Sequence, residues 1–416
     1  MTDRPLTETK RQIRLSAGHD TPGTDDVISV TSEESLAISG PSEGDTLWLA
    51  GLLVGGDWEL WLELINLGLL LEVEDDDGGR GGGAQPVSVW REDKGVDLVT
   101  GYLDSAAKAM GLTEQVEHDR RYDQADEYLQ VLYKLWEGSW ENDAVLNDPV
   151  QRIYARPDKV HKVKHEGEFY QVEGYHLSEP SPQRTPVLFQ AGSSDRGLVF
   201  AGRHAECVFI SGQTKAATKA QVDKVRASAV AAGRNPDDIK LFMGLNVIVA
   251  PTEAEALAKR DEYLSYASAE AGVAHFSSST GIDFADYELD EPIQYVKSNA
   301  IQSATKVLQN NDWTRRKLLE QHALGGRYIT LVGSPEQVAD ELESWIAETG
   351  LDGFNLTRIV TPESYVDFID LVVPELQRRG SYKTAYDTGS LRQKLFADGD
   401  AHLPQRHTGA AFRHSA

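Results

Sequence analysis

From about residue 93 onward, short apolar runs rich in β-branched residues alternate with helical patterns, and this alternation constrains the fold more than any other feature. Five such runs stand out: GVDLVTGY (95–102), TPVLFQAG (185–192), ECVFISG (206–212), IKLFMGLNVIVA (239–250) and GFNLTRIV (353–360). Strands that alternate with helices through short connections form parallel sheets with helices outside. The 416 residues suffice for one large α/β barrel or for two ordinary domains. We therefore predict an α/β fold built on a parallel sheet.

The helical segments between these runs carry start and stop signals. SPEQVADELESWIAETG (334–350) begins with a serine cap followed by proline and ends at Gly350. A second helical pattern covers 214–233 and also ends in glycine. Between 252 and 330 the pattern loosens, and HFSSSTGIDFADYELDEPI (275–293) reads as a long polar and aromatic loop. An insertion of this size between barrel strands is expected to form a lid or a substrate wall, and a passive surface excursion explains it equally well.

Residues 1–92 lack the alternation. They carry 18 acidic against 6 basic side chains, a net charge of −12, and include the run EDDDGGRGGG (74–83). The most hydrophobic segment, 47–74, is interrupted by Asp57, Glu59 and Glu63, and charges inside a membrane are costly, so we interpret it as not membrane-spanning. No secretory signal opens the chain, and we expect a cytoplasmic protein.

The charge balance narrows the possible partners. Lysine and arginine number 41 against 66 aspartate and glutamate residues, a net charge of −25, which argues against nucleic acid and anionic membranes as partners. Lysines number 17 and arginines 24, and abundant carboxylates with few lysines are typical of halophilic proteins. An ordinary acidic cytosolic protein is the alternative. The single cysteine, Cys207, excludes an intramolecular disulfide and is expected to be a small buried hydrophobe.

The first candidate site is LFQAGSSDRG, where a strand is followed by small residues and then by a helix. Gly192 lets the backbone approach a ligand closely, and Ser193 and Ser194 offer hydroxyl groups at the helix start. Free N–H groups and the positive end of the helix dipole favour an anion there, most naturally a phosphate. A plain serine cap is the alternative explanation.

The second candidate site is the start of the helix EHDRRYDQADEYLQVLYKLWEG (117–138). Its buried face is predicted from apolar residues spaced three and four apart: Leu129, Leu132, Tyr133 and Trp136. His118 and Tyr122 lie four residues apart on one face of the first turn, and both can donate hydrogen bonds to an anion or a carbonyl. A histidine with a purely structural role is the alternative.

Thr100 is the third candidate, because it follows a predicted strand at the end where a barrel places its ligand-contacting loops. The sequence shows none of the common zinc-protease, nucleotide-loop or nucleophile-elbow motifs, and its scattered histidines do not indicate a metal site. A predicted phosphate cradle without an obvious nucleophile or acid–base pair indicates that a cofactor carries the chemistry.

These segments resemble a known family. EHDRRYDQADEY (117–128), QAGSS (190–194) and the sequence around them, from about residue 93 to 390, resemble the luciferase-like flavin-dependent monooxygenases. The similar branch contains nitrilotriacetate monooxygenase component A, dibenzothiophene sulfone monooxygenase and pristinamycin synthase. The resemblance implies a (β/α)8 TIM-like barrel of the bacterial luciferase type, with its first strands doubtful or missing here.

The resemblance also implies a cofactor and partners. Reduced, diffusible FMN would come from a separate NAD(P)H:flavin reductase, and O2 would oxygenate a small xenobiotic, amine- or sulfur-containing substrate. A homodimer or homotetramer is expected. By the same resemblance, the FMN-binding residues would be Thr100 beside the ring, His118 and Tyr122 at the flavin or its phosphate, and Gly192, Ser193 and Ser194 at the phosphate.

The front of the chain departs from the family pattern. Family members begin with three further strand–helix units, and their next strand reads G-W-N-x-V-T-S where this chain reads GVDLVTG (95–101). We therefore predict an atypical N-terminal segment (1–92), a barrel (93–390) and a C-terminal tail (391–416). A frameshifted or decayed reading frame is the preferred explanation for the first segment, and a divergent domain is the alternative. The alternatives for function are a deazaflavin-dependent oxidoreductase and a non-catalytic remnant or partner subunit.

Overall fold

The computed structural model describes residues 95–98, 100–101, 104–192, 194–293, 313–324, 328–396 and 399–414, together with the backbone of three short strands near the N-terminus. The chain divides into two compact units, Met1–Arg91 and Glu92–Ala416. In the first unit, β1 (Arg11–Ser16) pairs antiparallel with β2 (Val27–Val30) and with β3 (Leu70–Val73). Most of the predicted atypical segment lies outside the described residues, so the frameshift hypothesis stays a prediction.

The second unit contains the predicted parallel sheet. Its strands are β4 (Gly95–Leu98), β9 (Val187–Ala191), β10 (Cys207–Ile210), β11 (Lys240–Val249), β12 (Ile329–Gly333) and β13 (Gly353–Thr357). Their order is β12-β11-β10-β9-β4, with β13 also paired to β11, and every pairing is parallel. Five of the six coincide with the predicted runs. β12 was not predicted from the sequence.

β11 is long enough to serve three neighbours. Its residues 240–243 pair with β10, 245–249 pair with β12, and 242–246 pair with β13. Because the β13 ladder overlaps both others, β13 occupies one edge of β11, and β10 and β12 share the other edge end to end. The segment between β11 and β12 is therefore anchored at both ends on one strand.

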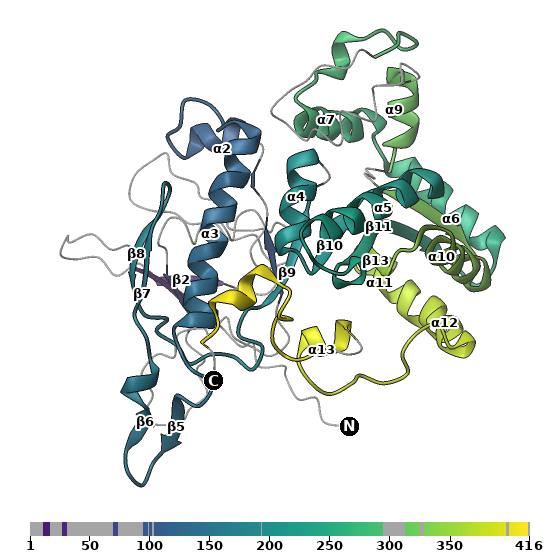
Figure 1. Ribbon diagram of the computed structural model, residues 1–416. Coiled ribbons are helices and arrows are strands. Elements are labelled where there is room, and N and C mark those ends of the chain that lie inside the picture. Colours follow the sequence, from purple (N-terminus) through teal and green to yellow (C-terminus); the bar gives the residue numbers. More distant parts are fainter. Residues whose placement is uncertain are drawn as a thin grey trace. The chain divides into compact units, whose positions relative to one another are not determined.

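The helices of this unit, several of which pack on the sheet (Figure 1), mostly begin at a serine or threonine cap. They are α2 (Asp104–Ala109), α3 (His118–Gly138), α4 (Asp195–His204), α5 (Lys215–Ala231), α6 (Glu253–Tyr266), α7 (Ala269–Thr280), α9 (Arg315–Gln321), α10 (Pro335–Thr349), α11 (Glu363–Asp367), η5 (Phe368–Val372), α12 (Val373–Arg379) and α13 (Leu391–Leu395). As predicted, Ser334 caps α10, and Gly350 ends it with a left-handed φ of 76°. No helix in the described ranges is long and apolar enough to cross a membrane.

Smaller elements complete the unit. Two antiparallel hairpins follow α3, β5 (Val145–Asp148) with β6 (Ile153–Ala155), and β7 (Val163–Glu166) with β8 (Gln171–Gly174). The 3-10 turns are η1 (Pro157–Lys159), η2 (Pro236–Asp238), η3 (Phe284–Asp286) and η6 (Thr408–Phe412). Glu127 on α3 holds the β7–β8 hairpin, because its carboxylate accepts hydrogen bonds from His165 and from the backbone N–H of Tyr170.

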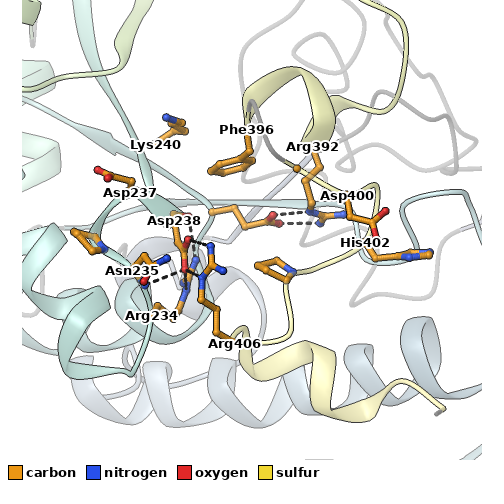
Figure 2. Close-up of a pocket in the computed structure, with 14 residues that line it drawn as sticks. Arg234, Asn235, Asp237, Asp238, Lys240, Arg392, Phe396, Asp400, His402 and Arg406 are labelled. Atoms are coloured by element: carbon orange, nitrogen blue, oxygen red, sulfur yellow. Dashed lines mark hydrogen bonds and ion pairs between the residues drawn. The ribbon is translucent and has the colours of Figure 1, made fainter. Parts of the chain in front are cut away.

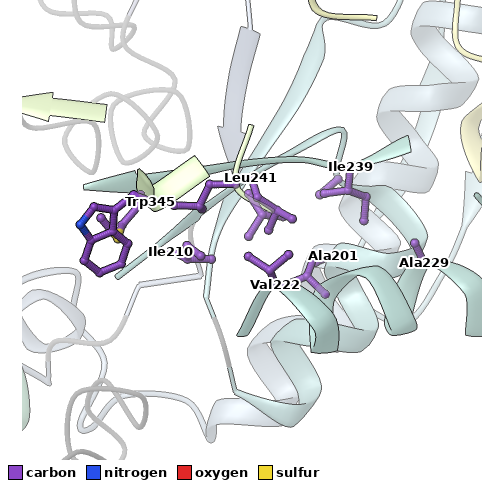
Figure 3. Close-up of a cluster of buried hydrophobic side chains, with 12 residues drawn as sticks. Ala201, Ile210, Val222, Ala229, Ile239, Leu241 and Trp345 are labelled. Atoms are coloured by element: carbon purple, nitrogen blue, oxygen red, sulfur yellow. The ribbon is translucent and has the colours of Figure 1, made fainter. Parts of the chain in front are cut away.

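The main core lies between the sheet and the helices α5 and α10 (Figure 3). Ile210 and Leu241 from the strands pack against Val222 from α5 and Trp345 from α10, and all four are at least 95% buried. Cys207 belongs to the same strand as Ile210 and is fully buried and free, as predicted. Burial raises the pKa of its thiol, so the group stays a neutral hydrophobe.

The insertion between β11 and β12 contains more helix than the sequence predicted. Residues 275–280, which read as loop, form the end of α7. Val273 and Phe284 pack with Leu318 of α9 in a separate small core, and this packing outweighs the weak helix propensity of the serine run. The prediction of a lid remains a proposal.

Candidate functional site

The start of α3 builds one side of the candidate site. The Glu117 carboxylate caps the helix by accepting hydrogen bonds of 3.0 Å from the backbone N–H groups of Asp119 and Arg120. His118 and Tyr122 are 92% and 95% buried, and their rings meet edge to face at 5.3 Å. The two residues therefore share one buried face, as their spacing predicted.

The Tyr122 hydroxyl is the centre of a polar cluster. Burial raises its pKa, and hydrogen bonds with the side chains of Ser194, Thr100 and Gln190 act in the opposite direction. One phenol therefore brings together three segments that are far apart in the sequence. They are the end of β4, the start of α3 and the β9–α4 turn. Thr100, Tyr122 and Ser194, which the sequence proposed separately, lie together.

Two glycines make this convergence possible. A Cβ atom added to Gly192 would lie 2.7 Å from the Tyr122 hydroxyl and 2.7 Å from Gln190 Nε2. A Cβ atom at Gly197 would lie 2.8 Å from the same hydroxyl and 3.0 Å from Ser194 Oγ. The two distances to the Tyr122 hydroxyl are shorter than ordinary van der Waals contacts of carbon. Any larger residue at either position would therefore displace the phenol.

Ser194 caps α4. Its Oγ accepts a hydrogen bond of 3.0 Å from the backbone N–H of Gly197, which is the ordinary role of a capping serine. Tyr122 places a second hydroxyl beside the capped first turn. The capping role of Ser194 is therefore confirmed, and phosphate binding at this serine remains a prediction. Ser193 lies outside the described residues.

Sequence reasoning missed three contributors: Gln190, Arg196 and Gly197. Gln190 lies one residue before the end of β9 and its side chain hydrogen-bonds with Tyr122 of α3, and its place two residues before Gly192 was the available signal. Arg196 lies 5.6 Å from the Tyr122 ring centre and donates a hydrogen bond of 3.0 Å to Asp123. The guanidinium therefore covers the phenol ring as a cation–π contact.

A series of hydrogen-bonded polar groups between α3 and α4 holds Arg196 in place. Arg196 also pairs with Asp126, whose Oδ1 lies 2.8 Å from His204 Nε2, and His204 Nδ1 lies 3.1 Å from the Tyr133 hydroxyl. Burial lowers the pKa of His204, and Asp126 opposes that shift. The series fixes α3 against α4, and thereby the two walls of the site.

The inner face of the sheet is aromatic. The ring centres of Phe189 and Phe209 are 5.5 Å apart, and those of Phe209 and Phe242 are 6.2 Å apart. Asp97 pairs with Phe189 in the β4–β9 register and so shares this face. Its Oδ1 is buried without a hydrogen-bond partner in the described part of the chain, and burial raises its pKa to about 6.

A cavity of about 630 Å³ lies at the opposite end of the strands, where Lys240 begins β11. The C-terminal segment closes it, and Figure 2 shows the ion pairs of Arg392 and Arg406 in its wall. Arg392 pairs with Glu206, and both are at least 98% buried. Residues at the amino ends of barrel strands serve stability, so we assign this cavity no part in the candidate site.

A metal centre has no support in the described ranges, which contain no group of three or more histidine, cysteine, aspartate or glutamate side chains placed to hold an ion.

The chain is similar to several known proteins. Residues 95–353 match the luciferase-like monooxygenase family. The chain is 45% identical to dimethyl-sulfide monooxygenase of Hyphomicrobium sulfonivorans, over 76% of this chain and 67% of that protein. It is 46% identical to long-chain alkane monooxygenase of Geobacillus thermodenitrificans, over 76% of this chain and 69% of that protein.

Solved structures give the same result. A riboflavin lyase structure with modified FMN and riboflavin superposes with a TM-score of 0.71 at 40% identity, covering 76% of this chain and 70% of that one. The structure of the Hyphomicrobium sulfonivorans enzyme gives a TM-score of 0.70 at 45% identity, covering 77% of this chain and 68% of that one.

Proposed function

The chain belongs to the luciferase-like monooxygenases, and we propose that it binds reduced FMN and uses O2 to oxygenate a small organic substrate. The family and the TIM-like barrel expected from the sequence are confirmed. A relative whose name states the cofactor is the FMNH2-dependent dimethylsulfone monooxygenase of Pseudomonas fluorescens, 27% identical over 59% of this chain. The proposed reaction needs the flavin as the redox group, because ordinary amino-acid side chains do not activate O2 by themselves.

The observation that carries the proposal is the polar cluster around Tyr122. A phosphate cradle needs small residues, hydroxyl donors and a helix N-terminus at one point, and Gly192, Ser194 and the start of α4 supply all three. The absence of a Cβ atom at Gly192 and Gly197 lets the Tyr122 hydroxyl lie close to the backbone of this turn, beside the Ser194 hydroxyl. The residues present therefore fit a phosphate-bearing cofactor.

Each residue has a defined task in this proposal. Ser194 and the backbone at the start of α4 hold the phosphate, and Tyr122 adds a hydroxyl donor whose raised pKa keeps it protonated. His118 is held by Asp119, with 2.6 Å between His118 Nδ1 and Asp119 Oδ1, so the opposite ring nitrogen is the one oriented for a ligand. Thr100 contributes from the end of β4. When bound, reduced flavin supplies the electrons that activate O2.

The substrate is proposed to be small and apolar or sulfur-containing. Its support is twofold. Relatives act on dimethyl sulfide and long-chain alkanes, by their names, and the inner face of the sheet carries the contacting rings of Phe189, Phe209 and Phe242. An aromatic surface stabilises apolar and polarisable ligands by dispersion.

The proposed partner is a separate NAD(P)H:flavin reductase that delivers the reduced cofactor. Its support is a relative whose name marks it as one component of a larger system, nitrilotriacetate monooxygenase component A of Aminobacter aminovorans. A homodimer or homotetramer remains a prediction.

Equilibrium titration with oxidised FMN, and with reduced FMN under anaerobic conditions, tests the proposal. Ser194→Ala and His118→Ala should each weaken binding by about ten-fold, the scale of a charge-assisted hydrogen bond. Ser334→Ala is the matched control, because Ser334 caps α10 in the same way. It should lower stability as Ser194→Ala does and leave FMN binding unchanged. Equal affinity in all three variants, or tighter binding of a deazaflavin than of FMN, contradicts the proposal.

A further inference from the structure

Gln190 carries an unused hydrogen-bond acceptor in the wall of the candidate site. The residue is 99% buried, and its Oε1 has no hydrogen-bond partner in the described part of the chain. Burying a polar atom without a partner is unfavourable, so native proteins rarely do it without a functional reason. The Gln190 oxygen is therefore an acceptor that a ligand donor would satisfy.

The other end of the same amide is already engaged. Gln190 Nε2 donates to the Gly192 carbonyl at 3.4 Å, and the side chain also hydrogen-bonds with the Tyr122 hydroxyl. The amide nitrogen would lie only 2.7 Å from a Cβ atom at Gly192, which places it against the cradle. The orientation of the amide is consequently fixed from its nitrogen side, and the oxygen is left for a ligand.

Another buried carboxamide in the same sheet has hydrogen-bond partners for both of its polar atoms. Asn246 on β11 is 97% buried, and both ends of its amide are used. Its Oδ1 accepts a hydrogen bond from the Thr357 hydroxyl, and its Nδ2 donates to Thr330 at 3.5 Å. Asn246 is thus complete without a ligand, whereas Gln190 is not.

We propose that Gln190 Oε1 accepts a hydrogen bond from a hydroxyl group that lies next to the phosphate of the bound ligand. An ionised phosphate offers only acceptors, so it cannot satisfy a second acceptor, and the donor must belong to the carbon chain that bears the phosphate. The ligand class is therefore a phosphorylated polyol. This inference rests on the proposed function, since the ribityl chain of FMN has such hydroxyl groups.

The test compares two flavins on the purified chain by fluorescence titration: FMN, and an analogue whose phosphate is carried by an unsubstituted pentyl chain. The unmodified protein should bind FMN about ten-fold more tightly than the analogue, the scale of one buried hydrogen bond. Gln190→Met should remove most of this preference. Asn246→Leu should keep it, and Ser194→Ala should weaken both flavins alike.

The outcomes separate the two proposals. If FMN binds but the preference is below about two-fold in the unmodified protein, or persists in Gln190→Met, the inference is wrong and the proposed function stands. If neither flavin binds the unmodified protein, both are wrong. The comparison of the two flavins on the unmodified protein does not depend on whether the variant folds.

Discussion

The two ends of the parallel sheet differ in how their buried polar groups are paired. At the carboxyl ends of β4 and β9, small residues surround the Tyr122 hydroxyl, and the Gln190 oxygen is left without a partner among the described residues. At the amino end of β10, Glu206 is bonded through both oxygens to Arg392, which also donates to the backbone carbonyl of Thr185 at 2.8 Å. Among the described residues, the first end keeps an unpaired acceptor beside small residues, and the second end is built around a paired buried charge.

This difference separates binding from stability within one sheet. A satisfied buried ion pair fixes the C-terminal segment to the strands, and removing one partner would leave the other charge buried. An unsatisfied acceptor beside tight glycines costs stability, and the proposed cofactor would supply the donor that it lacks. Substitutions at the two ends should therefore give different phenotypes.

Arg392→Met should produce the largest effect. The variant leaves the Glu206 carboxylate buried and unpaired, and the expected loss is about 3–5 kcal/mol of unfolding free energy. Denaturant unfolding followed by circular dichroism measures it. Arg378→Met is the matched control, because Arg378 pairs with Glu375 at 2.6 Å while its side chain is 69% exposed. The control should lose at most about 1 kcal/mol. Equal losses in the two variants would contradict the comparison.

Gly197→Ala should come next, and it should act mainly on binding. The added Cβ would lie 2.8 Å from the Tyr122 hydroxyl, so the hydroxyl must move away. This movement costs about 2 kcal/mol of unfolding free energy and disturbs the predicted phosphate site. FMN affinity should fall at least about ten-fold. Gly174→Ala serves as the control, because no atom lies within 4 Å of its added Cβ. Unchanged FMN affinity in Gly197→Ala would remove the glycine from the site.

Asp97→Asn should stabilise the protein by about 1–2 kcal/mol at pH 7.5. Burial raises the pKa of Asp97 from 3.8 to about 6, so the folded state holds its proton more tightly than the unfolded state. Stability from this group is present below pH 3.8 and is lost as pH rises through about 6. The variant should therefore gain at pH 7.5 and gain little at pH 4.

Asp126→Asn should change the stability at neutral pH in the opposite direction. Burial would raise the pKa of Asp126, but His204 and Arg196 together lower it, so its charge stabilises the fold at neutral pH. This variant should lose stability at pH 7.5. If both variants gain stability at pH 7.5, or if neither does, the burial of Asp97 and the ion pairs of Asp126 do not determine the direction of the change.

The smallest effect concerns salt, and it should act on both ends alike. A net charge of −25 gives carboxylate repulsion that molar KCl screens, and stability should rise by about 1 kcal/mol or less, roughly 2–4 °C. A series of neutral salts separates screening from salting-out. A melting temperature that is flat between dilute and molar KCl would contradict the halophile hypothesis.

Local signals allowed much of this to be predicted. The caps of α10, the shared face of His118 and Tyr122, and five strands follow from spacing and turn residues. The unused oxygen of Gln190 could not be foreseen, because hydrogen-bond satisfaction depends on neighbours from other segments. The end of α7 was missed because packing against Phe284 overrides the weak propensity of its serines.

The anchoring of one segment on β11 has a consequence for how such a protein can diversify. The segment leaves after Val249 and returns as β12, whose Ile329 pairs with Leu245 of the same strand. The insertion between β11 and β12 thus begins and ends on the same strand. The number of residues in it can change without shifting the register of β10 or β13. Doubling such a loop costs only about 0.6 kcal/mol in closure entropy. Exchange of this segment between relatives is a route by which one barrel scaffold can vary while its sheet stays the same.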